Sequence, residues 1–391
     1  MARNNDDIRI IAYYLPQFHR TPENDKWWGE GFTEWTNVKA AESLYEGHYQ
    51  PREPLDDNYY NLLDDEVIEW QSKIAEEHGI YGFCFYHYWF HGKLLLEKPV
   101  ENYLKNNNCK THFCICWANE SWTNSWAKDN DKVLIRQEYG DEEEWKSHFD
   151  YLYQFFNDDR YIKVDDKPLF VIYNAHIIPK LESMLSLWEK LAKEKGLKGI
   201  TFYTEGTYSI FMDYPGKELF KKHIEYQPQL AYSEKKSEKY LFLRKIKRRI
   251  SRFFYEKFGF DPVAGIGQKN DNKTIEKYSY DDIWQRILER VPENEEKYVP
   301  GAFVDWDNTP RKKYRGFVID GATPDKFKTY MTEQIRRAHR VYKSNELFVF
   351  AWNEWAEGGY LEPDKKYGYG YLEAIKQALE ESRSKEQEIK E

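Results

Sequence analysis

Short runs of apolar, β-branched and aromatic residues recur along the chain, and most are separated by stretches with helical periodicity. Several runs are almost entirely apolar, which is typical of parallel strands buried on both faces. Eight runs predict strands: Ile8–Tyr14, Ile80–Tyr86, His112–Trp117, Leu169–Tyr173, Gly199–Thr204, Ile224–Pro228, Gly301–Trp306 and Leu347–Asn353.

The intervening segments predict helices, except after the second and fifth strands, where the pattern is indistinct. Eight strands alternating with helices indicate an α/β fold, a single (β/α)8 TIM barrel over residues 1–391 with a charged tail at 380–391. A doubly wound sheet is the alternative, but neither GxGxxG nor GxxxxGK[ST] follows any strand. The predicted helices lie near 62–78, 142–157, 180–195, 279–291, 324–343 and 370–386.

Two insertions interrupt this alternation. The first βα loop runs from Leu15 to about Leu63, and loops of that length in a compact domain are usually functional. The second spans 231–277 and holds ten Lys or Arg against two acids within 235–257. Apolar residues recur there at helical spacing, so we expect a basic amphipathic helix. Such a helix either contacts an anionic membrane peripherally or packs on the barrel with a solvated basic face.

Composition narrows the function classes. Aromatic residues make up 18% of the 391 residues, and the formal net charge is −9. So many aromatics exclude a disordered chain, and the negative charge argues against nucleic acid as a partner. Some of the aromatic rings are expected to line a ligand site.

The compartment signals point to a cytoplasmic protein, peripheral to the membrane if 235–257 binds lipid. The N-terminus lacks the pattern of a signal peptide, and no apolar run approaches the ~20 residues of a membrane span. A leader removed earlier would instead make the protein periplasmic or secreted. The four cysteines have no zinc or CxxC spacing, so Cys114 and Cys116 are expected to be reduced core thiols.

The ends of the predicted strands carry aromatic residues beside polar ones. Catalytic groups of such barrels lie at the carboxyl ends of the strands. Rings that stack on sugar C–H faces beside hydroxyl-binding amides and carboxylates indicate an oligosaccharide or polysaccharide substrate. The candidate substrate-binding residues, at strand ends and in the first loop, are Tyr14, Trp35, His87, Tyr88, Trp117, Asn119, Glu120, Trp122, Tyr173, Tyr203, Glu205, Gln227, Asp305, Trp306, Asn353 and Trp355.

The last strand runs into WNEWAEGG, which places Glu354 and Glu357 three residues apart. Glycosidic cleavage needs a protonated carboxyl and an ionised one on either side of the reacting carbon. Apolar tryptophan walls could raise the pKa of one of them. The alternative is that both carboxylates bind backbone amides or an arginine such as Arg311 or Arg315.

Other motifs are weaker. Asp305 and Asp307 form a D-x-D sequence, as do Asp129 and Asp131, and some nucleotide-sugar transferases hold a divalent metal this way. His87 and His91 follow a strand and have no third ligand at matching spacing. Ser121 lacks the G-x-S-x-G context of a serine hydrolase. We therefore expect no metal and no cofactor.

Five segments, IIAYYLPQFH, WWGEGFTEWTNV, YGFCFYHYWF, CICWANESWTNSW and FAWNEWAEGGYLEPD, closely resemble the WbsX-like family over residues 8–365. That family is associated with glycosyltransferases of lipopolysaccharide O-antigen biosynthesis. The last segment also resembles glycoside hydrolase family 99, endo-α-mannosidases and mannanases built on a (β/α)8 barrel. Ala356 stands where that family usually has histidine, which puts the neighbouring subsite in doubt.

The second resemblance implies roles for two residues. It implies Glu354 as the general base that deprotonates the sugar 2-hydroxyl, which attacks C1 to give a 1,2-anhydro intermediate. It implies Glu357 as the general acid that protonates the leaving oxygen and then activates water or an acceptor. The configuration at C1 is retained overall.

Three functions remain open. The first is a retaining glycoside hydrolase acting on a bacterial polysaccharide, favoured by the paired glutamates. The second is a glycosyltransferase or transglycosylase of O-antigen or capsule biosynthesis, favoured by the cytoplasmic signals and the basic segment. The third is a non-catalytic glycan-binding protein, against which the presence of both glutamates counts.

Overall fold

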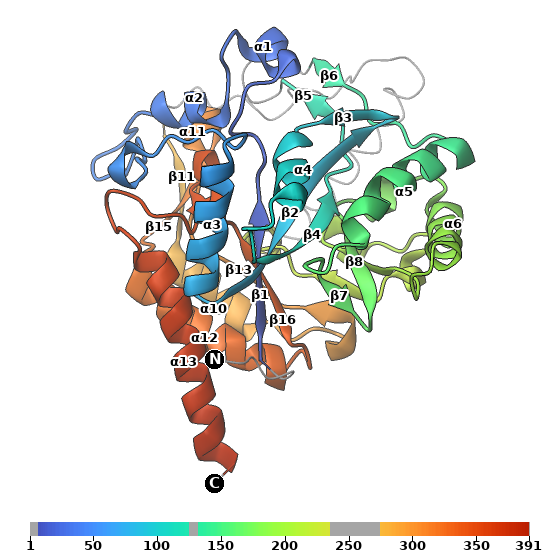
Figure 1. Cartoon of the computed structure of the whole chain (residues 1–391). Helices are drawn as coiled ribbons and strands as arrows, with labels where there is room; N and C mark the ends of the chain where they lie inside the picture. The colour runs from blue at the N-terminus through green and yellow to red at the C-terminus, as the bar shows by residue number, and fades with distance from the viewer. Residues whose placement is uncertain (1–6, 125–131, 235–273, 391) are drawn as a thin grey trace.

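A barrel of parallel strands surrounded by helices forms the centre of the computed structural model, which describes residues 7–124, 132–234 and 274–390 (Figure 1). The predicted (β/α)8 barrel is therefore confirmed. In chain order, the barrel strands are β1 (Arg9–Tyr14), β2 (Ile80–Phe90), β4 (His112–Trp117), β8 (Lys167–Ile172), β9 (Thr201–Thr204), β10 (Lys222–Ile224), β12 (Tyr298–Val299), β13 (Gly301–Phe303) and β16 (Glu346–Phe350).

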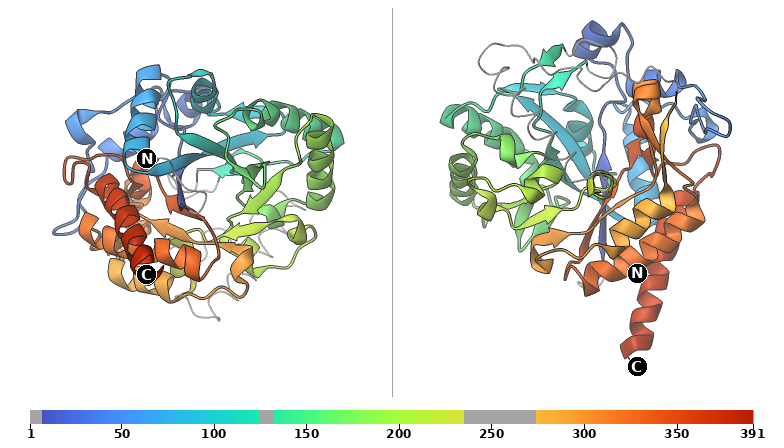
Figure 2. Two further views of the ribbon diagram at one scale, coloured as in Figure 1. Left: turned by 60° about the horizontal axis from the view of Figure 1, so that its bottom comes forward. Right: turned by 180° about the vertical axis from the view of Figure 1, so that it is seen from behind.

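The seventh barrel position is divided into two pieces. Pro300 separates β12 from β13, and proline has no N–H to give to a ladder. β12 pairs with β10, whereas β13 pairs with β16 on the other side. The sheet order β12-β10-β9-β8-β4-β2-β1-β16-β13 therefore begins and ends on this divided strand, and the elements form a ring in the tilted view (Figure 2).

Six helices lie where the periodicity predicted them. The segment after the second strand contains a helix that the pattern did not predict, α4 (Lys98–Lys105), and the fifth strand is followed by the short α7 (Thr207–Phe211). The sixth strand begins and ends earlier than expected, so residues 225–228 lie beyond its end. The predicted helices are α3 (Asp65–Glu77), α5 (Glu142–Phe156), α6 (Leu181–Glu194), α10 (Tyr280–Glu289), α12 (Pro324–Arg340) and α13 (Gly370–Lys390).

Alternate residues of the barrel strands face inward and outward. Tyr13 points into the barrel, where its ring stacks on Tyr86 and meets Tyr226 edge-on with centroids 5.4 Å apart. Tyr14 points outward, and its hydroxyl donates to Gln71 of α3. The inward set includes Cys84, Cys114 and Cys116, which are buried free thiols, as expected for the latter two.

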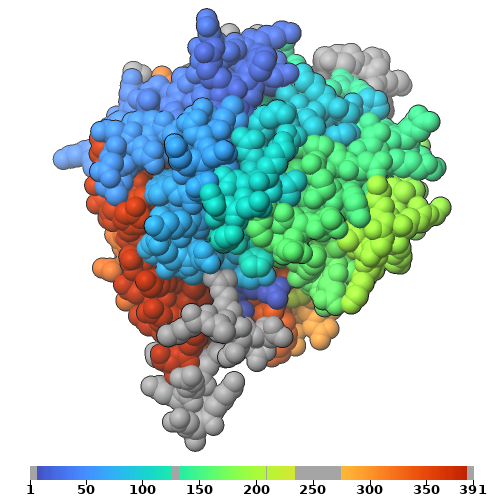
Figure 3. Space-filling view, viewed as in Figure 1, coloured from blue at the N-terminus to red at the C-terminus, as the bar shows by residue number. Residues whose placement is uncertain are grey.

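The first βα loop is long, as predicted, and contains α1 (Pro22–Trp28) and α2 (Glu34–Lys39). It lies at the end of the molecule to which the barrel strands point, and its blue surface covers the top of the face in Figure 3. The short strands are β3 (Lys93–Leu95), β5 (Trp122–Thr123), β6 (Val133–Ile135), β7 (Lys163–Val164), β11 (Glu276–Ser279), β14 (Trp306–Asp307), β15 (Phe317–Asp320), β17 (Asn353–Glu354) and β18 (Gly359–Tyr360).

Most of the second insertion, including the basic stretch 235–257, lies outside the described residues, so the expected amphipathic helix stays a prediction. The same holds for Asp129 and Asp131. Within the three described ranges, no helix is both long and apolar enough to cross a membrane.

Candidate active site

Glu354 and Glu357 lie on a compact turn directly after the last barrel strand. Glu354 ends β17, which pairs antiparallel with β18, and a single 3-10 turn over Trp355–Glu357 connects them. Gly358 closes the turn with a φ of +73°, a conformation that glycine adopts without steric cost. The Glu354 side chain is 7% exposed and that of Glu357 is 21% exposed, so Glu357 is the more accessible of the two.

Arg311 of the short helix α11 (Thr309–Lys312) binds both glutamates. Its Nη1 donates to Glu357 Oε1 at 2.7 Å and its Nη2 to Glu354 Oε2 at 3.2 Å. A third carboxylate, Glu34 at the start of α2, accepts from Arg311 Nε at 2.7 Å. The arginine contact considered as the alternative for this pair is therefore present, together with a carboxylate from the first βα loop.

Burial sets the electrostatics of this cluster. It raises the pKa of Glu354 to about 8, and the charges of Glu357 and Glu34 add to the rise while Arg311 opposes it. Burial disfavours the charge of Arg311, but Glu34, Glu354 and Glu357 raise its pKa well above the usual value. Near neutrality the cluster therefore holds a charged arginine and a proton on Glu354.

A polar network beneath the turn holds it in place. Asn353 binds the backbone of Leu15 through both amide atoms, which fastens the turn to the end of β1. The ring of Trp355 stacks on Tyr360, with centroids 3.8 Å apart, and its Nε1 donates to Glu362. Of the predicted sugar contacts, Asn353 and Trp355 therefore support the glutamates from below.

The same network extends to the first loop and to α3. The Tyr60 hydroxyl and Gln71 Nε2 both donate to Glu362, whose pKa burial raises to about 7. Trp35 packs against Trp355 and donates to the Tyr60 carbonyl. Tyr14 and Trp35, two predicted sugar contacts, are thus buried parts of this support.

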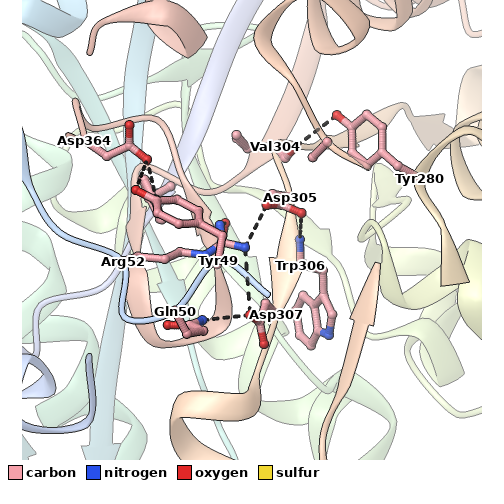
Figure 4. A network of polar contacts seen from close by, with 12 residues as sticks. Tyr49, Gln50, Arg52, Tyr280, Val304, Asp305, Trp306, Asp307 and Asp364 are labelled. Atoms are coloured by element: carbon pink, nitrogen blue, oxygen red, sulfur yellow. Dashed lines mark hydrogen bonds and ion pairs between the residues drawn. The ribbon is translucent and has the colours of Figure 1, made fainter. Parts of the chain in front are cut away.

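The D-x-D carboxylates are engaged by donors from the first loop (Figure 4). Arg52 Nη2 lies 2.8 Å from Asp305 and its Nη1 donates to the Gly358 carbonyl. Asp307 accepts from Gln50 Nε2 and contacts His48 Nε2 at 2.8 Å. These contacts join the first loop to the turn that carries Glu357. Asp305 and Asp307 therefore have a structural role in connecting the two segments.

The inward face of the barrel brings a second group of candidates together. Tyr173 packs edge-on against Tyr226, whose hydroxyl lies 3.2 Å from that of Tyr86. After burial, Glu120, Glu205 and Glu357 are the next causes that raise the pKa of Tyr173, so this ring lies among those carboxyls. Tyr86 and Tyr226 were not among the predicted contacts, although the inward parity of Tyr86 could have indicated it.

Glu205 lies deeper in the barrel. It is fully buried, and burial raises its pKa to about 8, opposed by the nearby Tyr13 hydroxyl and Cys116 thiol. Neither of its carboxyl oxygens has a well-formed hydrogen bond with the described residues. Gln227 Nε2 is likewise buried without such a partner. Both side chains can therefore form further hydrogen bonds inside the barrel.

Some of the remaining candidates lie at the open end of the barrel, and others support its backbone. Trp122 of β5 packs edge-on against Tyr88, and Tyr88 has its pKa raised by burial and next by the charge of Glu354. Asn119 is fully buried and binds the backbone of Asn174, whose side chain donates to Glu120. We keep Tyr88, Trp122, Glu120 and Tyr173 as candidate sugar contacts.

Three candidates point away from the glutamates, and this corrects the sequence interpretation. His87 and Trp117 occupy outward positions of their strands and contact His148 of α5. The Tyr203 hydroxyl donates to Glu346, the first residue of β16, which places it at the opposite end of the barrel. Trp306, by contrast, packs between Phe317 and Phe350, and its buried Nε1 has no hydrogen-bond partner among the described residues. Strand-end position alone does not reveal which face of a strand a side chain occupies.

No group of three or more His, Cys, Asp or Glu residues in the described ranges is arranged to hold a metal ion. His91 is exposed and lies 3.8 Å from Glu144, whereas His87 is buried against His148. The two histidines therefore do not form a pair.

Comparison with known proteins adds three findings. A sequence profile described as Glycosyltransferase WbsX matches residues 10–375. Two curated relatives, each named "Uncharacterized protein WxcX" and from strains B100 and ATCC 33913 of Xanthomonas campestris pv. campestris, are 32% identical over 377 residues. That match covers 95% of this chain and 49% of each relative, so the chain spans about half the length of these relatives.

Solved structures share the fold. A GH99 endo-α-mannosidase from Bacteroides thetaiotaomicron is 13% identical with a TM-score of 0.54, covering 98% of this chain and 99% of that one. A glycoside hydrolase-like protein is 12% identical with a TM-score of 0.55, covering 96% and 94%. At these identities the likeness establishes the barrel architecture.

Proposed function

The chain belongs to the WbsX glycosyltransferase family, which places it among glycan-processing proteins, and on that premise we propose that it cleaves glycosidic bonds of a bacterial polysaccharide or related glycan with retention. The observation that carries the proposal is the placement of Glu354 and Glu357. Both lie on the turn at the carboxyl end of the last barrel strand, and both bind Arg311. Barrels of this kind carry their catalytic groups at that end.

The proposed reaction has two steps. Glu354 takes the proton of the sugar 2-hydroxyl, whose oxygen attacks C1 as the bond from C1 to the leaving oxygen breaks. Glu357 gives its proton to the leaving oxygen. Glu357, now ionised, then takes a proton from water or an acceptor hydroxyl, whose oxygen opens the 1,2-anhydro ring at C1. The proton on Glu354 returns to the 2-oxygen, and the configuration at C1 is retained.

The electrostatics add one condition to these roles. Burial favours the proton on Glu354, whereas Glu357 accepts from Arg311. The cycle therefore requires the proton to reside on Glu357 when the glycan is bound. Substrates with an activated leaving group test the assignment, because they need no general acid. A variant that lacks Glu357 still releases the leaving group of such substrates in the first step, while its ring-opening step stays slow. A variant that lacks Glu354 loses the first step itself.

The alternative is a glycosyltransferase or transglycosylase of surface-polysaccharide assembly, which the family description favours. In that case an acceptor hydroxyl replaces water in the second step. Peripheral contact of residues 235–257 with an anionic membrane would suit such an enzyme, and we test it by co-sedimentation with anionic vesicles.

The experiment that separates the two functions is a polysaccharide panel assayed for new reducing ends, with and without nucleotide sugars and divalent metal. Release of reducing ends without either addition supports the hydrolase. Strict dependence on a nucleotide sugar supports the transferase. Binding of a glycan without any turnover under all conditions contradicts both and favours a glycan-binding protein.

A further inference from the structure

Glu34 is the most buried carboxylate around Arg311. Its side chain is 1% exposed, and its Oε1 accepts from Arg311 Nε and, at 3.3 Å, from Asn37 Nδ2. Its Oε2 is also buried and accepts no hydrogen bond from the described residues. Burial of a carboxylate with one oxygen unsatisfied is costly, so a position of this kind indicates a role beyond packing.

The guanidinium of Arg311 is divided among three carboxyls from three elements. Nε serves Glu34 of α2, Nη1 serves Glu357 and Nη2 serves Glu354. Because a guanidinium is a planar, rigid fork, the contact at Nε fixes the plane in which the two terminal nitrogens lie. Glu34 thereby sets how Arg311 faces the catalytic pair.

We propose that Glu34 is a positioning residue for the glutamate pair, which holds the Arg311 guanidinium between Glu354 and Glu357. This inference rests on the proposed function of the two glutamates. It assigns a specific task to the long first βα loop, which supplies Glu34 from a position about 320 residues before the pair.

Among the described residues, the charged and titratable groups with the largest effects around Glu354 are Arg311, Glu357, Glu34 and Tyr88. Removing the charge of Glu34 should lower the pKa of Glu354 for two reasons. A like charge next to Glu354 disappears, and Arg311 is left with two carboxylates to pair instead of three. Both changes favour the ionised form of Glu354.

The test is a carboxyl titration by NMR in protein labelled with ¹³C at the glutamate side-chain carboxyl. The Glu354 signal is the one that disappears in Glu354→Gln. In the wild type we expect its midpoint near pH 8. In Glu34→Gln we expect a midpoint lower by about one pH unit, within the effect of one neighbouring charge. The matched control is Glu30→Gln in the same loop, whose 90%-exposed side chain faces Arg20, and it should leave the midpoint unchanged.

An unchanged Glu354 midpoint in folded Glu34→Gln overturns the proposal. If that variant does not fold, Glu34→Asp serves, because the shorter side chain cannot reach Nε in the same way and Arg311 should turn toward the pair. Its midpoint should again fall, and a midpoint equal to the wild type overturns the proposal. Since the titration needs no substrate, its outcome is independent of the reducing-end assay that tests the proposed function.

Discussion

Single buried charges hold the candidate site together at the residue scale. Arg52 is the clearest case, because it binds Asp305 and the Gly358 carbonyl and lies 4.0 Å from Asp307. One cation from the first loop therefore supports two strand ends and the turn that carries Glu357. Such a pair contributes specific geometry, and breaking it leaves a buried carboxylate unpaired.

Replacing Arg52 with methionine should lower the free energy of unfolding by about 3–5 kcal/mol, the usual cost of removing one partner from a buried ion pair. Urea denaturation measures the loss. Arg20→Met is the matched control, because Arg20 is 56% exposed and solvent screens its pair with Asp25, so we expect a much smaller loss. Equal losses in the two variants would contradict the structural role of Arg52.

The raised pKa of Glu205 should make the stability of the protein depend on pH. Its folded pKa is about 8, above the value of 4.5 for a free glutamate. The folded state therefore binds more protons between these values, and the stability contributed by Glu205 is complete below pH 4.5 and is lost as the pH rises through 8. The urea midpoint of the wild type should fall between pH 7 and 8.5 more steeply than that of Glu205→Gln. Parallel pH profiles would show that Glu205 is not the proton-binding group.

At the scale of elements, the turn from β17 to β18 positions Glu354 and Glu357, the proposed catalytic pair. Gly358 has a positive φ, and a Cβ there would lie 2.8 Å from the backbone nitrogen of Asp307. The turn can therefore pack against β14 only with glycine at this position. The Arg52 guanidinium also lies next to Gly358. The turn is therefore held by contacts with β14 and with the first loop.

Gly358→Ala should lower both stability and turnover, because the Cβ adds a clash to the ~1–2 kcal/mol that a left-handed conformation costs. Gly196→Ala is the matched control, since Gly196 has a φ of +88° with no atom within 4 Å of its Cβ. We expect the control to lose only the conformational cost in a urea titration and to keep full turnover. Normal turnover in Gly358→Ala would mean that the turn tolerates displacement.

At the scale of the whole molecule, the barrel could be predicted because each buried parallel strand is a local apolar run that the sequence displays. The glutamate pair could be predicted because both residues lie within one motif. Strand ends were less informative, since Tyr13 and Tyr14 are neighbours that face opposite sides. Arg311 could be named from the sequence only as one of two possible arginine partners, and Glu34 not at all, because both meet the pair through tertiary packing of α11 and α2.

The central claim is that Glu354 and Glu357 carry the bond-breaking chemistry. The most direct measurement is the turnover of wild type, Glu354→Gln and Glu357→Gln on a natural glycan and on an aryl glycoside with an activated leaving group. We expect Glu357→Gln to lose about 10²–10⁴-fold on the natural glycan, the usual contribution of general acid catalysis, and to release the activated leaving group rapidly in the first turnover, followed by slow ring opening. Glu354→Gln should lose activity on both. Full activity of Glu357→Gln on the natural glycan would contradict the claim.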